Sequence, residues 1–315
     1  MHYRTITKSG IKLSEVGMGC NRLGGKEQPD SHWISLIQHS ADLGVNIYDT
    51  AEGYQHGRSE EMLGAALGNR DDVYIATKVG RGKNGPDFTF ERISLHVEAS
   101  LKRLQRTHID FLQLHSPSRQ ELEQYDWAES MVKLQTQGKI RFCAMAINTV
   151  EDAIWLIKQG LVDLVQITYN IFEPEAENEL FAVAEQFGVG LMGRLTLAQG
   201  VLTGKFRPGK PVASDHRVNM SGEERLNKRI EMVEDLRPIG ESYEGGLTRM
   251  AHQFSLSSPA ITTIIPGART IQQLEENVAA SNGMGLAEGV REKIEAIRPS
   301  WGEWQGGYWA GGKKK

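Results

Sequence analysis

The sequence predicts a single α/β domain folded as a (β/α)8 TIM barrel. Eight apolar runs of strand length alternate with helical patterns almost throughout the chain, and no linker divides them. Most of these runs are continuously apolar, which is typical of strands buried on both faces of a parallel sheet. The length of 315 residues also suits one barrel, which takes roughly 250 residues before insertions.

The expected barrel strands follow one another along most of the chain. They are Glu15–Cys20, Val45–Asp49, Val73–Lys78, Ile109–His115, Ile140–Ala146, Leu164–Asn170, Val189–Arg194 and Thr262–Pro266. A short β-hairpin of Tyr3–Ile6 and Ile11–Leu13 precedes them, with its turn at Lys8-Ser9-Gly10.

Helical patterns lie between the strands, and a glycine often follows where a helix should end. The patterns are Trp33–Leu43, Ser59–Leu67, Phe90–Leu104, Leu122–Thr136, Val150–Gln159, Glu175–Phe187, Thr248–Phe254 and Ile271–Ser281. Gly44, Gly138, Gly160 and Gly188 each stand just past a pattern, at the position favoured for a left-handed helix cap.

Two regions extend the simple barrel. The connection between Arg194 and Thr248 is unusually long and contains a polar helical segment, Glu223–Arg237; long connections in compact barrels are often functional. An extra helix is expected at Ala287–Ile297. We therefore expect a barrel domain over residues 1–298 and an aromatic C-terminal tail over 299–315, whose last residues should be disordered.

Composition excludes several classes of protein. The 36 lysines and arginines against 40 aspartates and glutamates give a net charge of −4, and the basic residues are scattered. No apolar run approaches the roughly 20 residues of a membrane span, and no basic patch indicates nucleic-acid binding. The N-terminal residues lack an apolar signal core. Two cysteines form neither a disulfide framework nor a zinc motif. The composition indicates a cytoplasmic protein without a metal site.

A glycine motif in the chain is misleading. The segment Gly80-Arg81-Gly82-Lys83-Asn84-Gly85 has the formal G-x-G-x-x-G spacing of a dinucleotide-binding loop. Pro86 follows it, where such a loop would lead directly into a helix. The context therefore favours an ordinary loop, and any dinucleotide must be bound in another way.

Four polar residues are expected to meet at one end of the barrel. Active sites of such barrels lie at the C-terminal ends of the strands. Asp49, Lys78 and His115 end three consecutive strands, and Tyr54 lies in the loop after the first of them. A nearby ammonium favours phenolate over phenol, a carboxylate would hold that ammonium charged, and a histidine could orient a carbonyl or relay a proton. The four residues together predict that Tyr54, with its pKa lowered by Lys78, protonates an oxyanion.

The segments around these residues resemble the aldo-keto reductase superfamily over roughly residues 1–297, in order. The similar segments are Asp49-Thr50-Ala51 with Tyr54, Val73–Lys78, Ile109–His115, Gly138-Lys139-Ile140-Arg141, Leu202-Thr203-Gly204-Lys205, Ile265–Arg269 and Glu276-Asn277. The resemblance implies reduction of aldehydes or ketones, sugars among them, with NAD(P)H and without a metal. By position, Tyr54 would be the general acid, Lys78 and Asp49 its tuners, and His115 the orienting residue.

The resemblance also implies a cofactor site. Its expected residues are Asn148, Gln166, Arg194, Leu202, Gly204, Lys205, Gly267, Arg269, Gln273, Glu276 and Asn277. Asn148 and Gln166 match carboxamide-binding positions, but Ile147 replaces the serine usual in the family, so one hydrogen bond should be missing. Arg194 stands where an aromatic residue often stacks on the nicotinamide, and a guanidinium can also stack or meet a carbonyl. Arg269 suits a 2′-phosphate, which favours NADP(H), with NAD(H) as the alternative.

The substrate is expected to be a small carbonyl or alcohol. Specificity should come from loops at the mouth and from the tail, with polar candidates and tail aromatics at Asn21, Arg22, Arg81, Ser116, Arg119, Trp301, Trp304, Tyr308 and Trp309. The tail could cover the mouth or pack outside the barrel. The chain is expected to be a monomer or a simple homo-oligomer.

Two other functions remain open. The first is a non-catalytic, cofactor-binding regulatory subunit of the same fold. The second is a Schiff-base lyase acting through Lys78, which a charged lysine beside Asp49 and Tyr54 disfavours.

Overall fold

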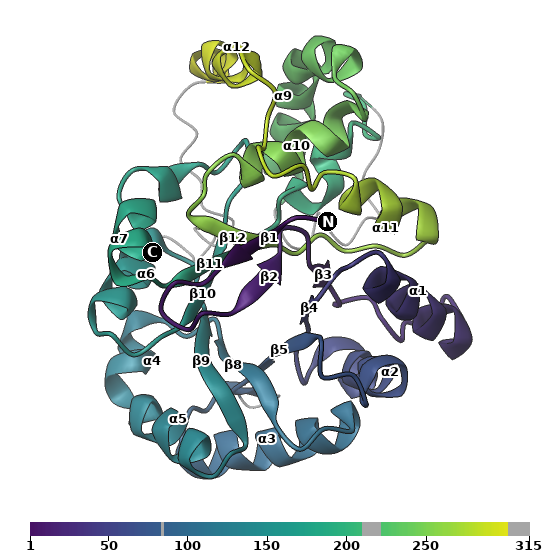
Figure 1. Cartoon of the computed structure of the whole chain (residues 1–315). Coiled ribbons are helices and arrows are strands. Elements are labelled where there is room, and N and C mark those ends of the chain that lie inside the picture. The colour runs from purple at the N-terminus through teal and green to yellow at the C-terminus, as the bar shows by residue number, and fades with distance from the viewer. Residues whose placement is uncertain (83–84, 210–221, 302–315) are drawn as a thin grey trace.

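The computed structural model describes residues 1–82, 85–209 and 222–301 of the chain. Within them, eight parallel strands form one curved sheet that helices surround (Figure 1). In sheet order the strands are β3 (Met18–Gly19), β4 (Ile47–Asp49), β5 (Tyr74–Val79), β8 (Ile109–His115), β9 (Ile140–Ala146), β10 (Leu164–Thr168), β11 (Gly190–Arg194) and β12 (Ile261–Ile264). The predicted (β/α)8 architecture is confirmed.

The barrel closes between its first and last strands. Val16 forms a parallel bridge to Ile264, and Gly19 forms one to Gly267. A Cβ atom on Gly19 would lie 2.6 Å from the carbonyl oxygen of Ile265, so this seam requires glycine. Strand β3 is much shorter than the predicted strand Glu15–Cys20, although Val16 still pairs with Ile264.

The predicted N-terminal hairpin is present and covers one end of the barrel. Its antiparallel strands β1 (Tyr3–Thr5) and β2 (Lys12–Ser14) lie across the barrel opening in Figure 1. Ile6 and Leu13 pack into an apolar layer of inward-facing strand residues. The strand residues of that layer are Ile47, Ala76, Phe111, Ala144, Leu164 and Met192. This layer seals the N-terminal end of the barrel with buried apolar side chains.

Helices cover the outside of the sheet. Those in the described residues are α1 (Asp30–Asp42), α2 (Arg58–Leu67), α3 (Phe90–Leu104), α4 (Arg119–Gln124), α5 (Trp127–Thr136), α6 (Val150–Lys158), α7 (Leu180–Phe187), α9 (Glu223–Ser242), α10 (Gly246–Leu256), α11 (Ile271–Val278) and α12 (Val290–Ile297). The extra C-terminal helix is confirmed as α12. It begins three residues later than expected because Gly289, with φ of 73°, precedes it.

Two of the predicted helices are interrupted in the structure. The expected helix Leu122–Thr136 is divided into α4 and α5, because Tyr125 has an extended backbone and the Trp127 indole donates to the carbonyl of Leu122 over 3.1 Å. The expected helix Glu175–Phe187 begins with the 3-10 turn η2 (Glu175–Glu177), and the α-helix follows only from Leu180.

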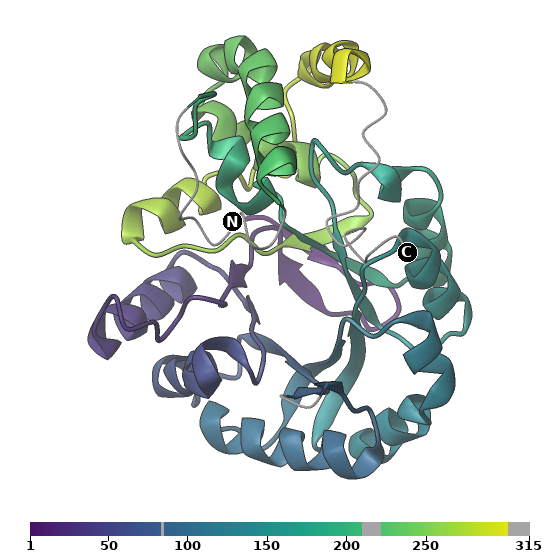
Figure 2. The same cartoon turned by 180° about the vertical axis from the view of Figure 1, so that it is seen from behind.

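The long connection after β11 packs on the rest of the domain through α9. Figure 2 shows α9 and α10 in green beside the yellow α12. Arg229 of α9 and Glu173 form a buried ion pair with an N–O distance of 3.0 Å. Asp235 of the same helix accepts a 2.9 Å hydrogen bond from the Trp301 indole, whose ring also contacts Phe172.

The start of the tail is therefore packed against α9 and the segment after β10. Trp301 is 8% exposed, which agrees with the packing alternative for this residue. The predicted tail aromatics Trp304, Tyr308 and Trp309 lie outside the described residues, as does the expected disorder of the last residues. No helix in the described part of the chain is both long and apolar enough to cross a membrane.

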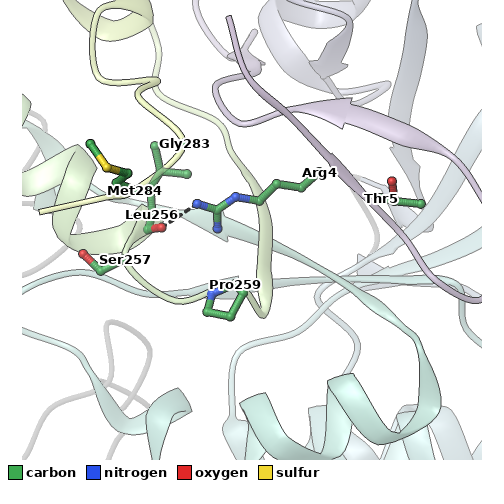
Figure 3. Close-up of a pocket in the computed structure, with 7 residues that line it drawn as sticks. All are labelled: Arg4, Thr5, Leu256, Ser257, Pro259, Gly283 and Met284. Atoms are coloured by element: carbon green, nitrogen blue, oxygen red, sulfur yellow. Dashed lines mark hydrogen bonds between the residues drawn. The ribbon is translucent and has the colours of Figure 1, made fainter.

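A hollow of about 410 Å³ lies at the N-terminal end of the barrel, and Figure 3 shows the residues that line it. The side chain of Arg4 points into it and donates to the carbonyl oxygens of Leu256, Ser258 and Ile261 over 2.6 to 2.8 Å. The same guanidinium bonds Glu15 through Nε over 2.9 Å. Arg4 thus ties the hairpin to the chain between α10 and β12, which makes this hollow a structural junction.

Replacing Arg4 should destabilise the fold without changing ligand binding. Arg4→Met leaves three carbonyls and one carboxylate without this donor, and we expect a loss of about 2 kcal/mol in the free energy of unfolding. Urea unfolding would measure it, with Lys12→Met, at an exposed hairpin position, as the control. Equal stability of the two variants would contradict a structural role for Arg4.

Candidate active site

The four predicted catalytic residues lie at the C-terminal end of neighbouring strands. Asp49 ends β4, Lys78 lies near the end of β5, and His115 ends β8; these strands are adjacent in the sheet. Tyr54 begins the 3-10 turn η1 (Tyr54–Gly57) after β4. The structure therefore brings the predicted set together.

Strand periodicity explains why a polar layer lies above the apolar one. Side chains two residues apart on a strand point to the same face. Two residues beyond the inward-facing apolar layer, the strands carry mostly polar side chains. These are Asp49, Lys78, Gln113, Gln166 and Arg194. The barrel interior thus has an apolar layer that seals its N-terminal end and a polar layer toward the C-terminal end, where the candidate active site lies.

Lys78 and Asp49 form a buried ion pair. The Lys78 ammonium donates to both Asp49 carboxylate oxygens over 2.6 Å and to the carbonyl of Thr50 over 3.0 Å. The side chains are 1% and 5% exposed. Burial alone would lower the pKa of Lys78, but attraction to Asp49 and Tyr54 outweighs it and raises that pKa above its usual value. Lys78 is therefore a fixed cation at neutral pH.

Tyr54 lies between this cation and His115. The Lys78 nitrogen is 5.1 Å from the centre of the Tyr54 ring, and the rings of Tyr54 and His115 are 6.0 Å apart at 84°. Burial lowers the pKa of His115 to about 3, with further contributions from Lys78, Arg81 and Arg194. His115 is therefore neutral at ordinary pH, which favours an orienting role over proton relay.

Unusual backbone conformations gather in the loops at this end. Gln55 and His56, directly after Tyr54, both have positive φ, and so does Ser116 after His115. Leu195, Ala198 and Gln199 have positive φ in the loop after β11. Such conformations cost free energy for residues other than glycine and occur preferentially at functional sites.

Two buried glutamines surround the Asp49 carboxylate. Its Oδ1 accepts from Gln166 Nε2 over 2.7 Å and from Gln113 Nε2 over 2.9 Å. Because a carboxylate can only accept, the amide nitrogen of each glutamine must face Asp49. Gln166 Nε2 also donates to Gln113 Oε1 over 3.1 Å. Among the described residues, no protein donor bonds Gln166 Oε1, which leaves it as an acceptor.

Asn148 is oriented in the opposite sense. Its Oδ1 accepts from the Arg194 guanidinium over 2.8 Å, and the same Arg194 nitrogen donates to the carbonyl of Ile147 over 2.9 Å. A guanidinium only donates, so the Asn148 amide nitrogen is left as a donor. The Arg194 guanidinium therefore bonds the carbonyl of Ile147. In many family members an aromatic residue occupies the Arg194 position.

The donor and acceptor of these two amides match a nicotinamide carboxamide. Its NH2 group needs an acceptor, which Gln166 Oε1 offers, and its carbonyl needs a donor, which Asn148 Nδ2 offers. Ile147 is buried and provides no side-chain hydrogen bond, as the sequence predicts. The residues present therefore fit the cofactor at this end of the site.

Three predicted cofactor residues lie in the loop after β11. Leu202 is fully buried, so its side chain belongs to the core. Gly204 has φ of 71°, and a Cβ atom there would lie 2.6 Å from the Leu247 side chain, so this turn requires glycine. Lys205 is exposed, with its ammonium 5.1 Å from the Phe206 ring centre. Gly204 is buried as well, so Lys205 is the one residue of the three that is exposed for a contact.

The predicted adenosine end lies between β12 and α11. Gly267, Arg269, Gln273 and Glu276 are exposed. The amide of Arg269 donates to Gln273 Oε1 over 2.9 Å, and the Arg269 carbonyl bonds His32 over 2.8 Å. No ion pair or hydrogen bond involves the Arg269 guanidinium within the described ranges. It is thus a cation at the start of a helix, where anions bind well.

Asn277 differs from the other adenosine-end residues because it is buried. Its Oδ1 bonds His252 over 3.0 Å, and its Nδ2 donates to the carbonyl of Gly267 over 3.3 Å. The other His252 nitrogen bonds the Thr196 hydroxyl over 3.0 Å. Burial lowers the pKa of His252 to about 4, so it is neutral. The hydrogen bonds from Thr196 through His252 and Asn277 to Gly267 link the loops after β11 and β12.

His252 and Gln113 are not among the site residues predicted from the sequence. The sequence holds a signal for Gln113, because it lies two residues before His115 in an apolar strand and so shares its face. His252 has only a weak signal, as one polar residue in a predicted helix.

Two of the predicted specificity residues have clear positions. Arg81 lies in the small hairpin of β6 (Arg81–Gly82) and β7 (Gly85–Pro86) and donates to the carbonyls of His115 and Ser116. This hairpin confirms that the G-x-G-x-x-G segment does not lead into a helix. Arg119 instead lies over the Trp155 ring at 3.9 Å and bonds Asp152, so both of these contacts hold its guanidinium against α6.

Comparisons with known proteins agree with this geometry. Residues 15–298 match the model of the aldo/keto reductase family. The uncharacterized oxidoreductase YqkF of Bacillus subtilis is 29% identical over 310 residues, covering 95% of this chain and 96% of that protein. A probable voltage-gated potassium channel subunit beta of Oryza sativa is 28% identical, with 94% and 96% covered. The structure of a glycerol dehydrogenase from Gluconobacter oxydans superposes with a TM-score of 0.82 at 25% identity, covering 95% of each chain.

The family match covers almost the whole barrel, including all the strands that carry the polar layer. The chain therefore belongs to the aldo/keto reductase family of oxidoreductases.

Proposed function

We propose that this chain is an NADP(H)-dependent oxidoreductase that interconverts a small aldehyde or ketone, including sugars, and the corresponding alcohol. The observation that carries this proposal is the buried Asp49–Lys78 pair beside Tyr54, facing a neutral His115. We further propose that it acts in the cytoplasm on a diffusible substrate, as a monomer or a simple homo-oligomer.

Each of the four side chains has one task in this proposal. Tyr54 donates its phenolic proton to the carbonyl oxygen as that oxygen gains negative charge, and takes a proton back in the reverse reaction. Lys78 stabilises the phenolate that this leaves, and Asp49 holds Lys78 charged and in place. His115, being neutral, hydrogen-bonds the same oxygen and orients it.

The cofactor, when bound, supplies the hydride that the carbonyl carbon accepts. Asn148 and Gln166 would hold its carboxamide, the loop with Gly204 and Lys205 would lie near its pyrophosphate, and Arg269 would bind a 2′-phosphate. The exposed main chain around Gly267, with Gln273 and Glu276, would contact the adenosine. Asn277 would act mainly by holding the Gly267 carbonyl.

A regulatory subunit without turnover is the second candidate. It is favoured by the similarity to a probable potassium channel subunit beta. The catalytic reading is preferred because all four side chains needed for proton transfer lie together. The lyase hypothesis is weaker, since a lysine held charged by Asp49 is a poor nucleophile for an imine.

Cofactor binding tests the proposal. NADPH and NADH would be titrated into the purified protein by tryptophan fluorescence and by calorimetry, followed by a panel of aldehydes and ketones. Saturable NADPH binding with turnover supports the proposal. Tight binding without turnover would favour the regulatory subunit, and no binding of either nucleotide would contradict both.

Arg269→Ala should weaken NADPH binding much more than NADH binding. Only NADPH carries the 2′-phosphate, and losing a charge-assisted contact costs about 1.5–3 kcal/mol, or roughly 10- to 150-fold in Kd. Calorimetry would measure both constants, with Lys12→Ala at the opposite barrel end as the control. Equal losses for the two nucleotides would remove the 2′-phosphate role.

A further inference from the structure

Gln113 is a buried polar residue in the barrel interior to which neither the sequence nor the proposed mechanism gives a role. It lies on β8, fully buried and two residues before His115. An amide in the core costs free energy unless both its ends are bonded. Gln113 satisfies both ends, with Asp49 Oδ1 at 2.9 Å and Gln166 Nε2 at 3.1 Å.

The hydrogen bonds among Asp49, Gln113 and Gln166 fix which end of each glutamine amide donates and which end accepts. The Asp49 carboxylate only accepts, so Gln113 must direct its nitrogen to Asp49 and its oxygen toward Gln166. That oxygen accepts from Gln166 Nε2, which also donates to Asp49. If the Gln166 amide were flipped, its oxygen would face two acceptors, Asp49 Oδ1 and Gln113 Oε1, and both hydrogen bonds would be lost. Asp49 and Gln113 together therefore hold Gln166 with its oxygen as the available acceptor.

We propose that Gln113 is a positioning residue that holds Gln166 in the orientation needed to accept a hydrogen bond from the cofactor carboxamide. The inference rests on the proposed function, because it concerns how the nicotinamide is recognised. Gln113 contacts neither substrate nor cofactor in this proposal. It connects the Asp49 carboxylate, which holds Lys78, to the Gln166 amide, which binds the carboxamide.

An analogue that lacks the carboxamide NH2 group tests the proposal directly. In 3-acetylpyridine adenine dinucleotide phosphate, a methyl group replaces that NH2. Calorimetry on the full chain would give Kd for NADP+ and for this analogue. The ratio of the two constants measures how strongly the protein reads the NH2 group, independently of turnover. We expect wild type to prefer NADP+ by about three- to tenfold, the value of one neutral hydrogen bond.

Gln113→Met keeps the volume and removes both hydrogen bonds. We expect it to reduce the preference for NADP+ to below about twofold, mainly by weakening NADP+ binding. The matched control is Gln253→Met, because Gln253 on α10 is also buried and also bonds at both ends, to Tyr243 and Ala280. That variant should keep the wild-type ratio even if its melting temperature falls.

A double-mutant cycle separates positioning from a general structural effect. If Gln113 acts through Gln166, then Gln113→Met should change the ratio little in a Gln166→Met background, whereas independent effects would add. If Gln113→Met does not fold, Gln113→Asn withdraws the amide by one methylene and should lower the ratio in the same direction.

The outcomes are distinguishable. Wild type that binds no nicotinamide nucleotide would overturn the proposed function. Wild type that binds but does not distinguish the two nucleotides, or a folded Gln113 variant that keeps the full preference for NADP+, would overturn this inference and leave the proposed function standing.

Discussion

Tyr54→Phe should lower kcat for carbonyl reduction by about 10³-fold, within the range that general acid catalysis contributes. The substitution removes one oxygen and leaves the ring, which contacts the Lys78 ammonium and packs edge-on against His115. No other described side chain replaces the donor, since Lys78 is bound by Asp49 and His115 is neutral with a pKa of about 3. Steady-state assays with NADPH and an aldehyde would measure the loss.

Binding must survive for this result to identify a proton donor. The Kd of NADPH for Tyr54→Phe should stay within about twofold of wild type, because Asn148, Gln166 and Arg269 are unchanged. Tyr125→Phe, at the junction of α4 and α5, is the matched control and should retain activity. Retained turnover in Tyr54→Phe would contradict the proposed mechanism, and loss of NADPH binding would show that the Tyr54 hydroxyl contributes to cofactor binding.

The sequence predicts the polar end of the barrel because parallel strands end at the same edge of a sheet. Asp49, Lys78 and His115 each terminate an apolar run, so their proximity follows from strand order alone. The predicted hairpin is present at the other end, where the structure shows that it supplies Ile6 and Leu13 to close an apolar layer. These features depend on periodicity and chain order, which a sequence contains.

Other features depend on partners distant in sequence. The direction of the Asn148 and Gln166 amides is set by Arg194 and Asp49, on other strands. Trp301 packs against α9 because Asp235 accepts its indole proton. Such choices are made by tertiary contacts and overrule local propensity.

Asp49→Asn should destabilise the protein as well as abolish activity. Lys78 is 1% exposed, so the variant leaves a buried ammonium without its counter-charge. Breaking such a pair costs about 3–5 kcal/mol. In the double variant Asp49→Asn/Lys78→Met the buried charge is gone, and part of that stability should return while activity stays lost. Urea unfolding at pH 7 would measure both, and equal stability of the single variant and wild type would contradict the burial argument.

Asp49→Asn should also reverse the sign of the contribution that Lys78 makes to the pH dependence of the unfolding free energy. In wild type the folded pKa of Lys78 lies above its unfolded value, so its stabilisation is complete below the unfolded pKa and is lost as pH rises through the folded pKa. In Asp49→Asn the burial that opposes the charge acts without Asp49 and should bring the folded pKa below the unfolded one. The unfolded state then binds more protons, so stability should rise with pH across that interval. The difference between the two unfolding free energies, measured from pH 7 to 10, should therefore shrink with increasing pH; a constant difference would mean that Lys78 stays protonated without Asp49.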